Sequence, residues 1–325
     1  MREAFRELIG ASRSMLALKQ RVARAAQFQV PVLIEGETGT GKELVARALH
    51  YQSPRRDGPF VPVNCGALPE SLIENEFFGH KRGAFTHAVG DSAGLLRLSQ
   101  GGTLFLDEVD SLPAKAQVML LRLLEDPVYR PLGGEREQGF DVRMLAASNQ
   151  CLEELVRQGR FRADLLFRLR LITLRIPPLR EREGDIDLLA EHFMRTVAQR
   201  YQLGAGRLQS SARAWLHQHD WPGNVRELEH WVCRTLLLSD SADLELLPED
   251  QAFTAHADDD RPLQYRDARA QALEAFDRGY LRELLSRHHG NITHAAREAG
   301  KERRALARLL KRYALDAASF RSLAR

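Results

Sequence analysis

Eight consecutive residues, GETGTGKE, combine three glycines with two glutamates and one lysine, Lys42. They follow a short apolar run, PVLIEG, and lead into the helix-forming segment GKELVARALH. Backbone N–H groups of a glycine turn at a helix N-terminus can hold phosphates, and a lysine at this spacing reaches the terminal ones. We therefore predict a nucleotide-binding loop formed by Gly36, Glu37, Thr38, Gly39, Thr40, Gly41, Lys42 and Glu43.

A second group of reactive residues ends the segment GGTLFLDE, where an apolar run leads into Asp107 and Glu108. Taken alone, two acids after a strand are more often a solvated loop. Together with a phosphate loop they predict ATP hydrolysis, with Asp107 orienting a magnesium ion and Glu108 polarising the attacking water. Because Glu43 stands where serine or threonine commonly holds the metal, we expect phosphates, water and Asp107 to hold magnesium.

Two arginines, Arg162 and Arg168, lie six residues apart in GRFRADLLFRLR. In isolation, arginines that flank leucines are ordinarily a solvated helix face. In an ATPase that forms rings, such arginines can reach the nucleotide of a neighbouring subunit and stabilise the charge of the transition state. Both interpretations remain open, and the phosphate loop and the acid pair favour the second.

The elements that would position these residues alternate along the chain. Apolar runs typical of strands occur in PVLIEG, PFVPVNC, GGTLFLDE, FDVRMLAAS and RLITLRIPPL, with helical or loop sequence between them. Strands that alternate with helices predict an α/β fold with a mainly parallel sheet covered on both faces. Before the first strand, a serine and a helical period predict an amphipathic helix over residues 12–27, with an apolar face of Met15, Leu18, Val22 and Ala25.

Beyond Pro178 the strand signals fade, and residues 185–247 have the pattern of several helices. Residues 249–262 are polar and acidic and end in proline, which suits an exposed linker. We therefore predict four parts, namely an α/β nucleotide-binding domain at residues 1–180, a helical lid at 181–248, a linker at 249–262 and a helical domain at 263–325.

The composition is that of an ordinary globular protein, with 44% hydrophobic and 28% charged residues. No run of eighteen apolar residues occurs, and the start, MREAFRELIG, lacks the apolar core of a signal peptide. Cys65, Cys151 and Cys233 are far apart and form no metal-ligand pattern. We expect a cytoplasmic protein with reduced thiols and no membrane partner.

The net charge of +3 hides a basic tail, because residues 261–325 hold 15 lysines and arginines against 7 acids. In NITHAAREAGKERRALARLLKRY, small apolar residues allow a close helix crossing, Gly300 supplies a turn, and the second helix is basic. The pattern predicts a helix-turn-helix that binds double-stranded DNA, with a solvated basic hairpin as the alternative. We expect base-edge or first phosphate contacts from Arg303 and Arg304, and phosphate contacts from Arg308, Lys311 and Arg312.

Six motifs occur in the order GETGTGKE, KRGAFTHA, GGTLFLDE, FRADLLFRL, PPLRERE and WPGNVREL. They resemble the AAA+ domain of bacterial enhancer-binding proteins, the activators of sigma-54 RNA polymerase, over roughly residues 8–240. The tail is similar to the Fis-type helix-turn-helix that ends many members. The resemblance implies a P-loop AAA+ α/β domain, a small helical lid domain and a C-terminal all-α DNA-binding domain.

Residue by residue, the family's phosphate, magnesium, water and arginine-finger positions match the residues named above, including a glutamate after the lysine. Asn64, in VNCGAL, matches the asparagine that couples Glu108 to the nucleotide state. Ser148 or Asn149 stands in the first sensor segment. Arg226 of WPGNVREL matches the sensor arginine of the lid.

The segment KRGAFTHA resembles GAFTGA, the family's surface loop, which rises from the ring when ATP is bound and pushes on the sigma factor. Such a loop needs no regular secondary structure, since its task is contact and movement. His87 replaces the second glycine, and it tolerates a left-handed backbone less well than glycine does, unless the position is permissive. The resemblance assigns the sigma-54 contact to Gly83, Ala84, Phe85, Thr86, His87 and Ala88.

We therefore expect a DNA-binding activator that uses ATP and magnesium to remodel closed complexes of sigma-54 RNA polymerase. The resemblance implies a hexamer with paired DNA-binding domains. Because the ATPase pattern begins within the first dozen residues, we expect no N-terminal regulatory domain, and control through a separate protein, oligomerisation or protein amount. A dimer contact or the core of the tail domain is expected from Leu273, Phe276, Tyr280 and Leu284.

Two alternatives remain. One is an ATP-binding, DNA-binding regulator that does not engage sigma-54, which the altered GAFTHA sequence favours. The other is a general protein-remodelling ATPase, and the predicted helix-turn-helix argues against it.

Overall fold

The computed structural model describes residues 8–84, 90–204, 206–239 and 243–245, together with residues 285, 288, 291–298 and 310. The chain divides into two units, Met1–Ala252 and Phe253–Arg325. The predicted phosphate loop, acid pair and lid belong to the first unit, and the basic tail belongs to the second. Within the described ranges, no helix combines the length and the apolar character that a membrane span needs.

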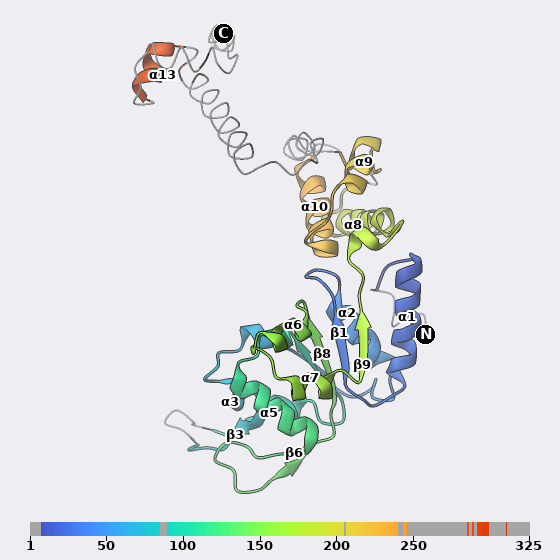
Figure 1. Ribbon diagram of the computed structural model, residues 1–325. Helices are drawn as coiled ribbons and strands as arrows, with labels where there is room; N and C mark the ends of the chain where they lie inside the picture. Colours follow the sequence, from blue (N-terminus) through green and yellow to red (C-terminus); the bar gives the residue numbers. More distant parts are fainter. Residues whose placement is uncertain are drawn as a thin grey trace. The chain divides into compact units, whose positions relative to one another are not determined.

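Among the described residues, five parallel strands form the central sheet of the first unit, in the order β2-β5-β8-β1-β9. Figure 1 labels β8, β1 and β9 of this sheet. All six residues of β8 and the first three of β1 are buried, as expected for inner strands covered on both faces. The predicted α/β class with a mainly parallel sheet is confirmed. The strands are β1 (Val32–Glu35), β2 (Phe60–Asn64), β5 (Thr103–Asp107), β8 (Arg143–Ser148) and β9 (Ile172–Arg175).

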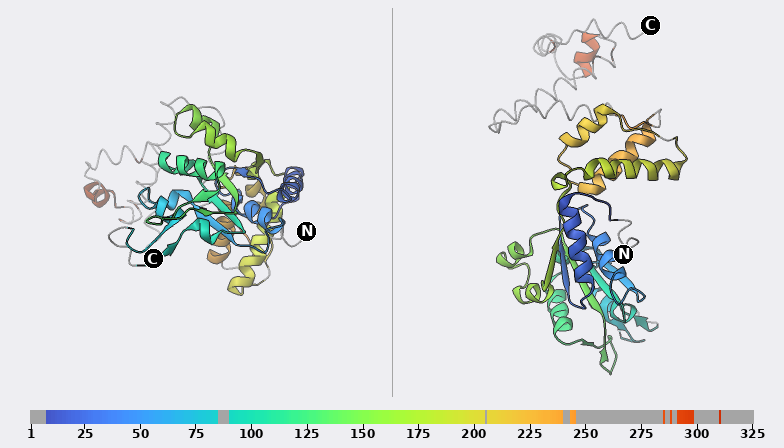
Figure 2. Two further views of the ribbon diagram at one scale, coloured as in Figure 1. Left: turned by 90° about the horizontal axis from the view of Figure 1, so that it is seen from below. Right: turned by 90° about the vertical axis from the view of Figure 1, so that its right-hand side faces the viewer.

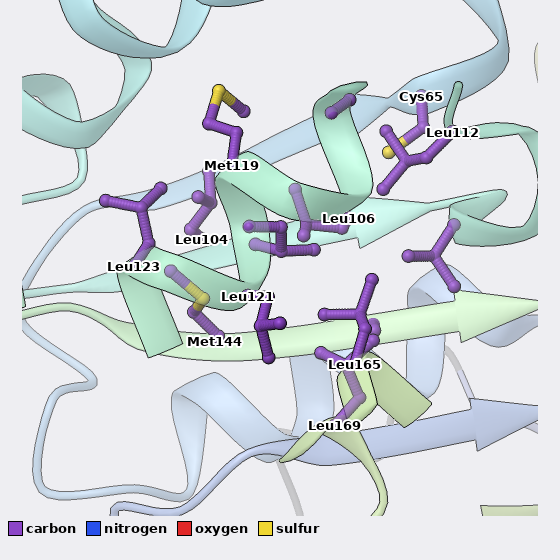
Figure 3. Packing of buried hydrophobic residues seen from close by; sticks show 14 of the residues in the cluster. Cys65, Leu104, Leu106, Leu112, Met119, Leu121, Leu123, Met144, Leu165 and Leu169 are labelled. Carbon is purple, nitrogen blue, oxygen red and sulfur yellow. The ribbon is translucent and has the colours of Figure 1, made fainter. Parts of the chain in front are cut away.

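One face of the sheet packs against α5 (Ala114–Glu125) and α7 (Ala163–Leu169) (Figure 3). Successive side chains of a strand point to opposite faces, so Leu104 and Leu106 of β5 share this face with Met144 of β8. Figure 3 shows these three side chains directed at leucines of the two helices. This leucine-rich core thus holds β5 and β8, and the residues at their carboxyl ends, in place.

The opposite face packs against α1 (Arg13–Ala26) and α2 (Lys42–Tyr51) (Figure 1, Figure 2). Phe105, the residue between the two leucines of β5, belongs to this second cluster. The Ser12 side chain accepts a hydrogen bond from the Met15 N–H and so caps α1. The predicted amphipathic helix is confirmed, because α1 buries Met15, Leu18, Val22 and Ala25.

Shorter elements connect the strands, including two antiparallel ladders, β3 with β4 and β6 with β7. Because β1, β5 and β8 run parallel, the loops that follow them lie at the carboxyl edge of the sheet, where ligands of α/β proteins bind. The shorter elements are η1 (Cys65–Ala67), α3 (Ile73–Phe78), β3 (Gly79–His80), β4 (Ser92–Ala93), α4 (Leu95–Leu98), η2 (Val109–Ser111), β6 (Val128–Tyr129), β7 (Gln138–Gly139) and α6 (Leu152–Arg157).

A helical lid follows the sheet, and its hydrophobic core includes three tryptophans. The rings of Trp215 and Trp231 stack with centroids 4.7 Å apart, and the buried Trp221 indole donates to the Leu216 carbonyl at 2.9 Å. Aromatic packing of this kind gives the lid a hydrophobic cluster of its own. Over the residues that the structure describes, the lid includes η3 (Leu179–Glu181), α8 (Asp185–Tyr201), α9 (Ser210–Gln218) and α10 (Asn224–Leu238).

In the second unit the structure describes α13 (Ile292–Glu298), which coincides with the first helix of the predicted helix-turn-helix. Ala295 and Ala296 are buried, and the Asn291 side chain accepts a hydrogen bond from the His294 N–H at 3.3 Å. The residues predicted to contact DNA lie outside the described residues, namely Arg303, Arg304, Arg308, Lys311 and Arg312, and so does the stripe of Leu273, Phe276, Tyr280 and Leu284.

Candidate nucleotide-binding site

The predicted phosphate loop joins the carboxyl end of β1 to the start of α2. Gly39 and Gly41 have left-handed backbones, with φ of +78° and +97°, which residues with a side chain rarely adopt. The Lys42 ammonium donates to the carbonyls of Gly36 at 2.9 Å and Glu37 at 3.2 Å. The loop therefore provides a glycine turn, a helix N-terminus and a cation, which together suit phosphate.

The acid pair lies beside this loop at the carboxyl end of β5, where Asp107 pairs in register with Asn64 of β2. Burial raises the pKa of Asp107, although a hydrogen bond from the Glu108 N–H and the charge of Lys42 act in the opposite direction. Burial lowers the pKa of Lys42, against the raising effect of Asp107, Asp110 and Glu108. One ammonium and several carboxylates thus share a partly desolvated space.

Asn64 directly precedes the short turn η1, and the Glu108 side chain lies beside this turn in space. The side-chain oxygen of Asn64 accepts from the N–H groups of Gly66 and Ala67, at 2.8 and 3.1 Å. A Cβ placed on Gly66 would lie 2.8 Å from Glu108 Oε2, so glycine leaves room there for the carboxylate. The coupling role that the resemblance gives to Asn64 stays a prediction.

The structure separates the two candidate sensor residues. Ser148 is buried, and its hydroxyl donates to Asp110 Oδ1 at 2.7 Å, while Gln150 Nε2 donates to Asp110 Oδ2 at 3.0 Å. Asn149 instead lines the pocket described below, with Nδ2 3.4 Å from Thr38 Oγ1. Asn149 therefore faces the pocket, whereas the Ser148 hydroxyl holds Asp110 in place.

A pocket of about 360 Å³ lies between the phosphate loop and the lid, within the size range of small-molecule sites. Its walls include the loop residues 38–43, Asp107, Glu108, Asn149 and Arg226, so the structure brings these predicted residues together. Several further apolar residues line the pocket and were not predicted, because an apolar side chain carries no sign of the cavity that it lines. These are Leu8, Ile9, Leu44, Leu189, Phe193 and Val225.

Arg182 and His192 also line the pocket, and neither was predicted. Arg182 is buried and donates to the Thr40 carbonyl at 3.0 Å and to the Pro177 carbonyl at 2.9 Å. Burial lowers the pKa of Arg182 to about 10 and also lowers the pKa of His192. The motif PPLRERE contains this arginine, but the sequence does not distinguish a buried arginine from a solvated one.

The start of α10 packs directly on the phosphate loop. The N–H groups of Val225 and Arg226 donate to the Gly39 carbonyl, at 3.1 and 3.3 Å. A Cβ placed on Gly39 would lie 2.1 Å from the Gly223 carbonyl, so no side chain fits between loop and lid. This contact carries Arg226 into the pocket.

Arg162 precedes α7 as its N-cap and Arg168 lies within α7, and their side chains are 46% and 55% exposed. Arg162 pairs with Asp164 at 2.7 Å, and this partner raises its pKa. Arg168 lies 3.4 Å from Glu125. Neither arginine lines the pocket of its own subunit, and both are accessible to a second molecule.

The structure describes the base of the KRGAFTHA loop. Asp91 accepts hydrogen bonds from the Lys81 ammonium at 2.5 Å and the Arg82 N–H at 2.9 Å, which draws the two ends of the loop together. The Lys81 N–H donates to the Leu132 carbonyl at 2.9 Å, in the turn between β6 and β7. Gly83 and Ala84 belong to this base, and Phe85, Thr86, His87 and Ala88 lie outside the described residues.

Comparison with known families identifies each part of the chain. The sigma-54 interaction domain matches residues 8–175, the AAA+ ATPase lid domain matches residues 180–263, and the Fis family of bacterial regulatory proteins matches residues 272–313. The chain therefore belongs to the family of sigma-54-dependent transcriptional regulators, with a P-loop AAA+ domain, a helical lid and a C-terminal helix-turn-helix.

Individual relatives extend this similarity over nearly the whole chain. The transcriptional regulatory protein GlrR of Escherichia coli is 42% identical over 98% of this chain and 71% of its own length. The response regulator PilR of Pseudomonas aeruginosa is 44% identical over 95% of this chain and 70% of its own. The crystal structure of NtrX from Brucella abortus in complex with ATP is 36% identical, with a TM-score of 0.72 over 95% of this chain and 69% of that one.

Proposed function

We propose that the protein binds ATP with magnesium in the pocket between phosphate loop and lid, and hydrolyses it. The observation that carries this proposal is that Lys42, Asp107, Glu108 and Arg226 line one pocket. Lys42 and the loop N–H groups would hold the phosphates, and Glu108 would orient and polarise the attacking water. The crystal structure of NtrX, a relative by sequence and fold, in complex with ATP supports a nucleotide as the ligand.

Asp107 is the residue that we assign to magnesium. The part of the chain that the structure describes contains no group of three or more His, Cys, Asp or Glu residues arranged to hold a metal ion. Magnesium commonly keeps several waters and binds through one or two carboxylates plus substrate phosphates, so a single half-buried acid beside the loop fits. Bound there, the ion would neutralise charge on the phosphates.

Arg162 and Arg168 are proposed to act on the nucleotide of a neighbouring subunit. Both are exposed and lie outside the pocket of their own chain, as an arginine finger supplied by another molecule must. The proposal therefore includes a ring, with a hexamer as the form that the family resemblance implies.

We further propose that ATP turnover remodels closed complexes of sigma-54 RNA polymerase through the KRGAFTHA loop, while the helix-turn-helix holds the protein on double-stranded DNA at enhancer-like sites. Membership of the sigma-54 interaction family and the Fis-type match support this. The alternative, a regulator that does not engage sigma-54, rests on His87 alone, and the comparisons give it no support.

Substitution at Glu108 tests the catalytic assignment. We expect Glu108→Ala to bind ATP with nearly unchanged affinity and to hydrolyse it at least about 100-fold more slowly, because the water loses its positioning base. Unchanged hydrolysis would contradict the assignment.

Mixing two inactive variants tests the shared site. In a mixture of Glu108→Ala and Arg168→Ala subunits, some interfaces combine an intact Glu108 with a neighbour's intact Arg168. We expect partial recovery of ATP hydrolysis in the mixture, and none in either variant alone. A mixture as inactive as its components would contradict the arginine finger.

A further inference from the structure

The phosphate loop carries an acid whose side chain binds the lid. Arg180 of η3 donates to both Glu37 oxygens, from Nη1 to Oε2 at 2.9 Å and from Nη2 to Oε1 at 2.6 Å. Asn224, the first residue of α10, donates from Nδ2 to Glu37 Oε2 at 3.1 Å. A two-bond arginine fork fixes the carboxylate more firmly than a single hydrogen bond would.

The backbone of the same residue holds the phosphate-binding lysine. The Glu37 carbonyl accepts from the Thr40 hydroxyl at 2.8 Å and from the Lys42 ammonium at 3.2 Å. Glu37 therefore connects the lid, through its side chain, with the shape of the loop and the place of Lys42, through its backbone.

Asn224 departs from right-handed helical backbone geometry, and its side chain is held in the contact with the loop. It is buried, has a left-handed backbone with φ of +52°, and accepts from the Leu179 N–H at 2.8 Å. Its Nδ2 also lies 3.1 Å from the Thr38 carbonyl. The Asn224 side chain thus connects η3 and α10 of the lid to the phosphate loop.

The charge at Glu37 is unfavourable for the loop's proposed ligand. A carboxylate within a loop that binds phosphates repels them, unless a cation neutralises it. Arg180 and Asn224 hold the pKa of Glu37 at about 2, so the carboxylate is ionised and its charge is compensated. A lid that moves away would leave this charge unpaired.

We propose that Arg180, Glu37 and Asn224 form a latch through which the position of the lid sets the affinity of the phosphate loop for nucleotide. The inference rests on the proposed nucleotide site and adds positioning residues distinct from Arg226. In the described part of the chain, none of the three lines the pocket, so they act through the loop and Lys42.

Calorimetric titration of the full chain with magnesium and ADP tests the latch without hydrolysis. We expect Arg180→Ala to raise the Kd for ADP about 5- to 50-fold, a size typical of coupling between sites. Glu37→Gln combined with Arg180→Ala should return the Kd to within about threefold of Glu37→Gln alone, because no unpaired carboxylate remains. A merely structural role would not produce this rescue.

The Arg175 and Glu35 pair supplies a matched control. It joins β9 to β1 at 2.8 Å beside the loop and does not reach the lid. Arg175→Ala should leave ADP binding unchanged. If Arg180→Ala does not fold, Arg180→Lys keeps the charge, loses the fork and should give a smaller increase in the Kd.

The outcomes separate the latch from the site itself. A wild-type protein that binds ADP, a Lys42→Ala variant that does not, and an Arg180→Ala variant that binds like wild type would overturn the latch and leave the proposed function standing. Loss of affinity in Arg180→Ala that Glu37→Gln does not relieve would also overturn it. Absence of ADP binding in wild type would overturn the nucleotide site, and the latch with it.

Discussion

At the scale of single residues, the fold tolerates an acid in the phosphate loop because the lid compensates its charge. Hydrogen bonds from Arg180 and Asn224 lower the pKa of Glu37 from 4.5 to about 2. A carboxyl group whose pKa is lower in the folded chain stabilises the fold above the unfolded pKa. This contribution is lost as the pH falls through the folded pKa.

The contribution of Glu37 to the free energy of unfolding should therefore depend on pH in the acidic range. We expect wild type to exceed Glu37→Gln in free energy of unfolding above pH 4.5, with a difference that shrinks as the pH falls and vanishes near pH 2. The difference should be no more than about 1 kcal/mol, because the paired side chains are 42% and 41% exposed. Urea unfolding across this range measures it, and a difference independent of pH would contradict the role of the charge.

The motifs predicted which residue types gather at the pocket, but not where every side chain points. Lys42 and Arg226, almost two hundred residues apart in the sequence, line one pocket, as the family pattern implied. The sequence places Glu37 in the phosphate loop and Ser148 or Asn149 in the sensor segment, and the structure adds that the side chains of Glu37 and Ser148 bind Arg180 and Asp110. A motif fixes residue type and local backbone, whereas partners distant in sequence decide the direction of the side chain.

At the scale of elements, the contact between phosphate loop and lid depends on glycine. A helical period of apolar residues predicted α1, and short apolar runs predicted the five strands, since buried helices and inner strands both leave such marks in the sequence. No such period marks the contact of Gly39 with Gly223, because it involves backbone alone. The sequence therefore does not predict how closely the lid approaches the phosphate loop.

Substitution of Gly39 tests this contact. A Cβ at Gly39 would lie 2.1 Å from the Gly223 carbonyl, and the φ of +78° is unfavourable for alanine. We expect Gly39→Ala to push the lid from the loop and raise the Kd for ADP at least about tenfold, while strain of this kind costs roughly 1–3 kcal/mol of stability. Gly159→Ala is a suitable control for stability, since its φ is +69° and no atom lies within 4 Å of the added carbon. Equal ADP affinity in wild type and Gly39→Ala would contradict the contact's role.

At the scale of the whole molecule, the proposed tasks divide between the two units. We assign ATP hydrolysis and sigma-factor contact, as proposed, to the unit Met1–Ala252, and the proposed DNA binding to the unit Phe253–Arg325. A single chain does not contain the complete proposed site, because the nucleotide that Arg162 and Arg168 are proposed to contact is bound by another subunit. The sequence alone left a solvated helix face and an arginine finger both open for these residues, since exposed arginines carry no signal of a partner.

The central claim is that nucleotide chemistry drives contact with sigma-54, and one measurement addresses it most directly. Purified protein is incubated with ADP, aluminium fluoride and sigma-54, and the mixture is passed over a sizing column. Bound beside ADP, aluminium fluoride mimics the phosphoryl group during its transfer. We predict that the two proteins elute together, and that Lys42→Ala abolishes this. Separate elution of a wild-type protein that binds ADP would contradict the account, and capture restored by His87→Gly would favour a regulator that has lost sigma-54.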